Sequence, residues 1–402
     1  MRVLFVSSQA PIPGTRFGGA KRLYYLAREL ERRCELSVLA LDGCREIKPD
    51  DPPPREFARY LQLPQVTLPR AWGRWELLPG VRSTFGRHRE AIGAFLGDRD
   101  FDALLMAYPL ALRFLEFDWG RAFGRKIYLE DDLMEERYRE AALSGSWPQR
   151  VAAGFRAAQT GRFYRRQLKG LDAFVGISPA EVGIMRERYP GLPARQLGYG
   201  IPLADFPLLP EPEERSVLGF IGNYRHPPNE DAAAWLMSEL FPRISALAPG
   251  ARLVLAGPHL PAALAERCVP GGPVRYMGEV GQVEDFFRSI GVFINPVRTG
   301  RGLRTKAIEA AAFGRPILST RLGAEGLDGL QLGVADDSEG LARAFQSRLD
   351  AAAWRAETAA NRAAVERLFS LEALGGEMMG WLAGTGSVGQ ALGLRRTAAS
   401  GA

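Results

Sequence analysis

The stretch VFINPVRTGRGLRTKAIEAAAFGRPILS, residues 292–319, decides the fold of this chain. It begins with the apolar run 292–295, passes through a loop that contains Gly300 and Gly302, and enters a helix-like segment that opens near Leu303. A second apolar run follows at 316–319. Strand, loop, helix and strand in this order are the repeating unit of a parallel sheet covered by helices, so the stretch predicts the α/β class.

The same alternation of short apolar runs and amphipathic segments extends toward both ends of the chain. In the first half, strands are predicted at 3–7, 35–41, 103–107, 126–129 and 173–177, with a helix at 20–33. In the second half, the strands that precede residue 292 are predicted at 217–221, 252–256 and 274–277. Two such series predict two Rossmann-like doubly wound domains, which bind ligands at the carboxyl ends of their strands. We expect the domains to face each other across a cleft.

The length of 402 residues also favours two domains, because one hydrophobic core seldom supports so long a chain. Prolines and acidic residues interrupt the periodicity at 203–214, which is the predicted linker. We therefore expect an N-terminal acceptor-binding domain at 1–202 and a C-terminal nucleotide-sugar-binding domain at 215–375. Residues 339–382 are predicted to be helical, and 376–402 to form a last helix followed by a disordered tail.

Composition and charge exclude several classes of protein. Apolar residues make up 46% and charged residues 24%, as in a globular α/β protein. The three cysteines show neither disulfide nor zinc spacing, and no signal peptide or membrane span is evident, so a cytoplasmic location is expected. The net charge is +6, without a nucleic-acid recognition motif, so no nucleic-acid partner is expected.

A local concentration of positive charge is found at 156–169, where basic and aromatic residues alternate. Its members are Arg156, Arg162, Arg165, Arg166 and Lys169, with Phe155, Phe163 and Tyr164 between them. Basic and aromatic residues at helical spacing predict peripheral contact with an anionic membrane, at the inner face of the cytoplasmic membrane, or with a phosphate-bearing acceptor. The alternative is the solvated face of an ordinary helix.

The densest group of residues able to bind phosphate lies at 300–314. Gly300 and Gly302 let backbone N–H groups approach a phosphate at a helix N-terminus, and Arg304, Thr305 and Lys306 follow at once. Lys306 and Glu309 are three residues apart on one helical face; the lysine suits phosphates, and the carboxylate suits ribose hydroxyls. The alternative is an ordinary surface ion pair. Lys306 is the only lysine after position 169, and a compact ammonium among many arginines favours a site.

In the first half, polar residues follow several predicted strands. Gly18 and Gly19 open the first helix and suit donor phosphates. Asp131 and Asp132, with Glu130 before them and Arg137 beyond, follow the strand 126–129 and predict an acceptor site or a shared proton; Asp132 is equally placed to cap the next helix.

Two further groups are weaker candidates. The D-x-D spacing at 98–102 precedes its strand, which favours a solvated turn over a metal site, so no metal ligand is expected. Asn223 and Arg225 follow the strand 217–221, with His226 after them, and are predicted to bind the donor.

The second half then resembles a known family. Phe220-Ile-Gly-Asn-Tyr-Arg-His-Pro-Pro228, Tyr276-Met-Gly-Glu-Val280, Gly300-Arg-Gly-Leu-Arg-Thr-Lys306-Ala-Ile-Glu309, Gly314-Arg-Pro-Ile-Leu-Ser-Thr320 and Gly323-Ala-Glu-Gly-Leu327 are similar, in this order, to the group 1 (family 4) retaining glycosyltransferases. Gly18-Gly-Ala-Lys-Arg-Leu23 and Leu129-Glu-Asp-Asp132 look like the corresponding N-terminal segments.

The resemblance implies the GT-B fold, a nucleotide-sugar donor, retention at the anomeric carbon and neither metal nor cofactor. It implies that Lys306, Arg304 and Glu309 are catalytic, that the backbone of Val280 meets the base, and that the last helix crosses back to the first domain. The acceptor would be a lipid-linked or other saccharide in cell-surface polysaccharide or glycoconjugate synthesis.

Much of the family carries two glutamates eight positions apart, and Arg301 replaces the first of them here. A branch with the pattern G-x-G-x-x-x-K also lacks that first glutamate, and Gly300, Gly302 and Lys306 fit it. Two alternatives stay open: a nucleotide-sugar 2-epimerase, and a catalytically silent partner that binds nucleotide-sugar.

Overall fold

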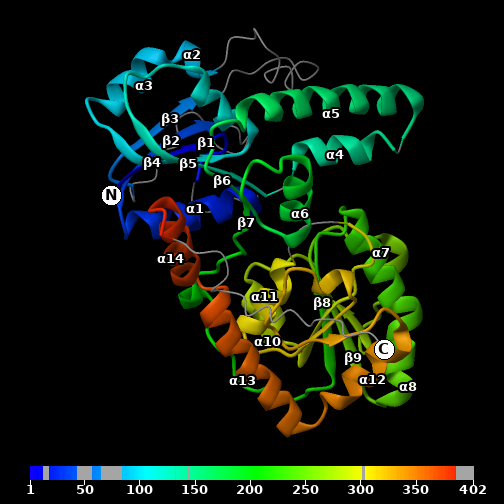
Figure 1. Cartoon of the computed structure of the whole chain (residues 1–402). Helices are drawn as coiled ribbons and strands as arrows, with labels where there is room; N and C mark the ends of the chain where they lie inside the picture. Colours follow the sequence, from blue (N-terminus) through cyan, green and yellow to red (C-terminus); the bar gives the residue numbers. More distant parts are fainter. Residues whose placement is uncertain are drawn as a thin grey trace, which may run out of the picture. The chain divides into compact units, whose positions relative to one another are not determined.

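A computed structural model describes residues 1–11, 18–42, 57–64, 84–131, 133–143, 145–300 and 304–385 (Figure 1). The chain divides into two compact units. Unit 1 is formed by Met1–Gly200 together with a C-terminal segment that begins at Leu374, and unit 2 by Ile201–Ala373. Each unit has its own sheet and its own hydrophobic core.

Unit 1 is built on a seven-stranded sheet with the order β3-β2-β1-β4-β5-β6-β7. Every neighbouring pair is parallel. The strands are β1 (Arg2–Ser7), β2 (Glu35–Asp42), β3 (Tyr60–Pro64), β4 (Phe101–Ala107), β5 (Phe123–Glu130), β6 (Ala173–Gly176) and β7 (Ala194–Gln196). The chain order reverses between β1 and β4, which makes the carboxyl ends of these strands the topological switch point of unit 1.

Helices cover both faces of this sheet. They are α1 (Gly18–Glu31), α2 (Thr84–Arg87), α3 (Arg89–Leu96), η2 (Pro109–Glu116), α4 (Met134–Ala141), α5 (Trp147–Gln167) and α6 (Pro179–Arg188). Along β1, Leu4 and Val6 enter one core cluster while Val3 and Phe5 enter another, as the alternation of side chains in a strand requires. A strand buried on both faces reads as a continuous apolar run, which explains why β1 was predictable.

Unit 2 repeats the design with a six-stranded parallel sheet of order β10-β9-β8-β11-β12-β13. Its strands are β8 (Val217–Ile221), β9 (Arg252–Ala256), β10 (Val274–Tyr276), β11 (Val292–Asn295), β12 (Ile317–Ser319) and β13 (Gly333–Val334). Its helical segments are η3 (Leu203–Asp205), α7 (Pro227–Trp235), the π-turn η4 (Leu236–Leu240), α8 (Phe241–Leu247), α9 (Ala262–Ala265), α10 (Val283–Arg288), α11 (Thr305–Ala312), η5 (Leu322–Ala324), α12 (Ser338–Ser347) and α13 (Ala351–Leu368). The switch point lies between β8 and β11.

The predicted α/β class and all ten predicted strands are confirmed, with ends that differ by a few residues. Three strands were missed: β3, β7 and β13. They lie at the outer edges of the sheets, where one side of a strand has no partner and its residues are only partly buried. These three edge strands have few consecutive apolar residues and were therefore missed, whereas the edge strand β10 was predicted.

The segment 203–214, predicted as a linker, packs closely on unit 2. The Phe206 ring contacts Phe313 with centroids 5.2 Å apart, and the Leu209 amide donates to the carbonyl of Phe313 at 3.2 Å. The predicted helical region 339–382 is confirmed as α12, α13 and α14 (Leu371–Leu382).

Helix α14 packs on unit 1. Its side chains Leu374, Met378, Trp381 and Leu382 join the cluster that contains Val3 and Phe5 of β1. The predicted tail lies outside the described residues from 386 onward.

Candidate functional site

The residues predicted to bind the donor in unit 2 lie around the switch point, on the loops that follow β8, β10 and β11. Strands β8 and β11 pair only through Val292 with Leu218 and Phe293 with Gly219. Their carboxyl ends lead into the loops that carry Asn223 and Gly300. Open doubly wound sheets bind ligands at this place, because the connecting helices leave in opposite directions there.

Helix α11 begins at Thr305, directly after Arg304, and Gly302 and Arg301 lie outside the described residues. Its first backbone N–H groups have no acceptor within the helix, which makes this end a place for an anion. Arg304 precedes the first turn and donates from Nη2 to the Gly300 carbonyl at 3.1 Å. Burial lowers the pKa of this guanidinium, and the charge of Glu325 opposes the shift.

Lys306 and Glu309 form the ion pair that their spacing predicts, with Nζ 2.7 Å from Oε2. The two side chains differ in environment: that of Lys306 is 42% exposed and that of Glu309 only 8%. The helical ion pair of Arg139 with Glu135 shows the same difference, at 48% and 2%, so what sets the pair of Lys306 and Glu309 apart is its place in the first turns of α11. The Lys306 ammonium at the start of α11 is therefore partly exposed and is held in place by the Glu309 carboxylate.

The loop before α11 is held against α7. Arg298 forms a two-point ion pair with Asp231, at 2.8 and 3.2 Å, and its guanidinium lies 4.9 Å from the centroid of the Trp235 ring. Gly300 has a φ of 89°, and a Cβ there would lie 2.8 Å from Cγ of Pro228. Only glycine combines that backbone conformation with the close packing, so residue 300 is fixed against the start of α7.

Asn223 and Arg225 lie on the loop between β8 and α7 and are exposed. The Asn223 side chain accepts from the Arg225 amide at 3.0 Å, which closes a tight turn at the strand end. Gly257 at the end of β9 has a φ of 106°, and a Cβ there would lie 2.0 Å from the Gly222 carbonyl oxygen. The two strand ends therefore approach backbone to backbone. Val280, half-buried, lies on the loop between β10 and α10.

Sequence reasoning missed the residues that tie β11 to the loop after β12. The Asn295 amide donates to the Gly323 carbonyl at 2.8 Å, and the Thr320 hydroxyl accepts from the Gly323 amide at 2.9 Å. Both polar side chains are buried. The sequence could have indicated both residues, because Asn295 ends a predicted strand and Thr320 follows the next one. Site residues of such folds lie at these strand ends.

In unit 1, Gly18 and Gly19 begin α1 as predicted. Gly19 is closely covered: a Cβ there would lie 2.2 Å from the Tyr108 hydroxyl and 3.6 Å from Oδ2 of Asp131. Tyr108 has a φ of 66° and precedes Pro109, an unfavourable conformation that is typically kept at functional sites. The start of α1 and the carboxyl ends of β4 and β5 thus converge.

Asp131 joins these elements through two side chains that sequence reasoning missed. Arg22 of α1 donates to Oδ1, and the Tyr108 hydroxyl donates to Oδ2 at 3.0 Å. Arg22 is buried and also donates to the Leu197 carbonyl at 2.9 Å; burial lowers the pKa of its guanidinium. Tyr108 follows a predicted strand at its carboxyl end, by the same rule that identified Asp131.

Glu130 lies in a different network from that of Asp131, and the prediction that Asp131 and Asp132 share a proton falls partly outside the described residues. The Glu130 carboxylate accepts from the hydroxyls of Tyr128 and Tyr164 at 2.6–2.8 Å and from the Met134 amide at 3.0 Å. The group is fully buried, and burial raises its pKa to about 7, although the three donors favour the charged form. Glu130 thus supports the first turn of α4. Asp132 lies outside the described residues.

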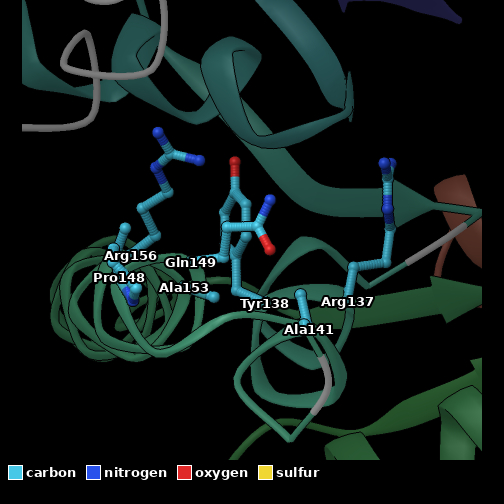
Figure 2. Close-up of a pocket in the computed structure, with 9 residues that line it drawn as sticks. Arg137, Tyr138, Ala141, Pro148, Gln149, Ala153 and Arg156 are labelled. Carbon is cyan, nitrogen blue, oxygen red and sulfur yellow. The ribbon is translucent and has the colours of Figure 1, made fainter.

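Arg137, the third predicted acceptor residue, lies on α4 beside a pocket of about 610 Å³ between α4 and α5. Figure 2 shows Arg137 and Arg156 on opposite sides of Tyr138 and Gln149. The side chains of Arg137, Tyr138 and Arg156 point in the same direction. Two guanidinium groups beside a phenol suit an anionic, hydroxyl-bearing ligand.

The structure also describes the D-x-D segment at 98–102 and the aromatic residues of α5. Asp98 pairs with Arg121, while Asp100 and Asp102 accept from the backbone amides of Ala122 and Arg2. These carboxylates support strand ends, in line with the expected turn. Of the aromatic residues at 155–164, Phe163 and Tyr164 are buried in the core of unit 1 and do not belong to a basic surface. The sequence could not show this, because their positions alternate with exposed ones along α5.

Comparison with known proteins shows what the chain is similar to. Residues 215–351 match the model of the family "Glycosyl transferases group 1". Among curated proteins, none gives a significant match. Among solved structures, sucrose-phosphate synthase from Thermosynechococcus elongatus is similar at 19% identity, over 95% of this chain and 98% of that one, with a TM-score of 0.64.

HepE of Anabaena in complex with UDP is similar at 12% identity, over 96% of this chain and 100% of that one, with a TM-score of 0.62. WaaG, a glycosyltransferase involved in lipopolysaccharide biosynthesis, is similar at 14% identity, over 95% and 100% of the two chains, with a TM-score of 0.57. Residues 215–351 are therefore similar to the group 1 glycosyltransferases, and the two doubly wound units of the chain have the GT-B fold.

Proposed function

We propose that the protein transfers a sugar from a nucleoside diphosphate donor to an acceptor hydroxyl, with retention at the anomeric carbon and without a metal ion. The observation that carries the proposal is the buried carboxylate of Glu309 paired with the half-exposed ammonium of Lys306 at the start of α11. This pair lies at the carboxyl edge of a doubly wound sheet, beside the switch point.

The donor is bound by groups of different chemistry. The diphosphate accepts from the first N–H groups of α11, among them that of Thr305, and from Arg304 and Lys306. Lys306 has three donors, so it can keep its bond to Glu309 and still reach a phosphate oxygen. A free oxygen of Glu309 accepts from the ribose hydroxyls.

The remaining donor contacts come from the surrounding loops. The Val280 backbone meets the base, while Asn223, Arg225 and Gly302 complete the pocket.

The catalytic task is departure of the diphosphate from the anomeric carbon as the acceptor oxygen attacks it. Negative charge grows on the leaving group, and preorganised cations and amides aimed at it stabilise the transition state by about 3–4 kcal/mol for each strong donor. Arg304 and Lys306 supply the positive charge that a metal ion supplies in other enzymes. HepE, which shares the fold, has been solved with UDP and with UDP-glucose, which supports a nucleotide-sugar donor.

The acceptor is a saccharide or lipid-linked saccharide of a cell-surface polysaccharide or glycoconjugate, and the protein acts at the inner face of the cytoplasmic membrane. Support comes from the pocket beside Arg137 and Arg156, which suits an anionic, hydroxyl-bearing molecule. Asp131, fixed by Arg22 and Tyr108, is the carboxylate available to orient the acceptor hydroxyl. WaaG, which shares the fold, is involved in lipopolysaccharide biosynthesis, and this supports the same class of acceptor.

The test replaces Lys306 by Met and measures donor binding separately from folding. The control is Arg343→Met. This change also removes the cation of an ion pair within one helix, because Arg343 pairs with Glu339 on α12. We expect UDP and other nucleoside diphosphates to raise the melting temperature of the wild type and of the control, but not of Lys306→Met. Wild-type stabilisation by nucleotide in Lys306→Met would show that this ammonium does not bind the donor.

A panel of nucleotide-sugars then separates the possible activities. Release of nucleoside diphosphate that depends on acceptor supports transfer. Conversion of the donor without acceptor would identify a 2-epimerase, and binding without turnover would identify a silent partner. The anomeric configuration of the product, read by NMR, tests retention, and full activity in excess EDTA tests metal independence.

A further inference from the structure

Large apolar side chains are exposed together at one end of the α4–α5 hairpin. They are Leu143 in the turn, which is 80% exposed, and Trp147, Val151 and Phe155 on α5, at 75%, 53% and 53%. Positions four residues apart lie on one helical face, so the three side chains of α5 form a row. Four of the nine large apolar residues exposed in the described parts of the chain are thus gathered in one segment. Such a concentration usually marks an interaction site.

The same face of α5 becomes basic further along the helix. Arg162 and Arg166 continue the row at helical spacing, and Lys169 follows just beyond the helix end; all three are exposed. Helix α5 contains five arginines and no acidic residue. We call the row Trp147, Val151, Phe155, Arg162, Arg166 and Lys169 the outer face of α5.

The opposite face of α5 is already satisfied. Ala153, Ala157 and Gly161 are buried, and a Cβ on Gly161 would lie 2.9 Å from Oε1 of Glu135 on α4. Figure 1 shows α4 and α5 side by side, extending beyond the sheet of unit 1. Small residues on the inner face allow this close packing, so the larger outer residues contribute nothing to the core.

The acidic residues of α4 do not neutralise the outer face. Glu135 is buried and bound by Arg139 and by the Tyr189 hydroxyl, each at 2.7 Å, and Glu136 pairs with Arg188 of α6. Glu140 is the exposed carboxylate of α4. The outer face therefore combines apolar side chains with uncancelled positive charge.

We infer that the outer face of α5 docks on the surface of an anionic phospholipid bilayer. Trp147, Val151 and Phe155, with Leu143 at the tip, enter the boundary between headgroups and acyl chains, while Arg162 and Arg166 contact lipid phosphates. A helix that has an apolar row, basic neighbours and no acidic residue is complementary to anionic lipid, which attracts both parts at once. The described helices include none long and apolar enough to span a bilayer. This inference assigns a surface to the membrane location given under the proposed function, and its evidence is the outer face of α5, not the transfer reaction.

The first test measures co-sedimentation of the full chain with vesicles of phosphatidylcholine alone or with about one third phosphatidylglycerol. The double variant Trp147→Ser, Phe155→Ser is compared with the control Leu247→Ser, Val269→Ser, which removes exposed apolar side chains from unit 2. We expect binding to anionic vesicles to fall at least about tenfold in the first variant and to stay at the wild-type level in the control. All four positions are exposed, so the variants keep their fold.

Charge and insertion are tested separately. Arg162→Gln with Arg166→Gln should weaken binding and reduce its dependence on salt, whereas Arg321→Gln with Arg343→Gln on unit 2 should not. Brominated lipid should quench tryptophan emission in the wild type and less in Trp147→Phe. The inference is overturned if the wild type ignores anionic vesicles, or if Trp147→Ser, Phe155→Ser binds them as the wild type does. It is also overturned if the wild type self-associates through this face and that variant is monomeric.

Discussion

The buried carboxylate of Glu130 makes a quantitative prediction about stability and pH. In the replacement Glu130→Gln, the side-chain oxygen still accepts from the Met134 amide, and the hydroxyls of Tyr128 and Tyr164 can rotate to accept from the new NH₂ group. The variant therefore keeps the network and loses only the ionisation. The difference in unfolding free energy between this variant and the wild type should therefore depend on pH.

The sign and size follow from the two pKa values of the wild type. Burial raises the pKa of Glu130 from 4.5 to about 7 in the folded protein. As the pH rises above 4.5, the unfolded chain releases the proton while the folded one retains it, so stability falls until the pH passes 7. Below pH 4.5 the contribution of Glu130 to the stability of the folded state is fully present, and above pH 7 it is lost. The difference between the pKa values corresponds to about 3 kcal/mol.

The assay is hydrogen exchange on peptides that span β5 and α4, corrected for the intrinsic rate at each pH. Exchange localised in unit 1 is preferable to a global melt, because two units need not unfold together. Glu130→Gln should gain about 3 kcal/mol relative to the wild type between pH 4.5 and 8. The control Glu35→Gln, at an exposed ion pair with Arg99, should differ from wild type by less than about 0.5 kcal/mol throughout. A difference between Glu130→Gln and wild type that is constant across this range would refute the reasoning.

Two further substitutions test the ends of the strands. Gly257→Ala combines a left-handed backbone with a backbone clash and should destabilise unit 2 by about 2–4 kcal/mol in thermal unfolding, whereas Gly281→Ala, with open space around it, should be nearly neutral; equal melting temperatures would disprove the constraint. Asp131→Asn leaves the buried Arg22 without its counter-charge and should cost unit 1 about 3–5 kcal/mol in urea unfolding, while Asp98→Asn, at the surface, should cost under about 1 kcal/mol; similar losses would contradict a buried pair.

The candidate donor site was predictable because its chemistry is local in sequence. Gly300, Arg304, Lys306 and Glu309 lie within one loop and the first turns of one helix, and helical spacing alone brings Lys306 to Glu309. The central strands were predictable for a related reason. Parallel strands covered on both faces are continuous apolar runs, and the carboxyl end of each run then points to the residues that can meet a ligand.

Tertiary structure alone decided which residues Asp131 and Glu130 contact. Arg22 and Asp131 are 109 positions apart, and Tyr164 is 34 positions from Glu130, so no spacing rule connects them. It also decided which face of α5 is exposed. Phe155, Phe163 and Tyr164 are all aromatic, and only the packing of α4 and the core against the other face of α5 leaves Phe155 exposed.

The sequence thus determined the central strands of both sheets and the pairing of Lys306 with Glu309, because both depend on periodicity within short segments. The tertiary structure decided which side chains are buried. Burial raises the pKa of Glu130 and encloses the ion pair of Arg22 with Asp131, while the row from Trp147 to Phe155 stays exposed. Burial is a property of long-range packing, which no short segment contains.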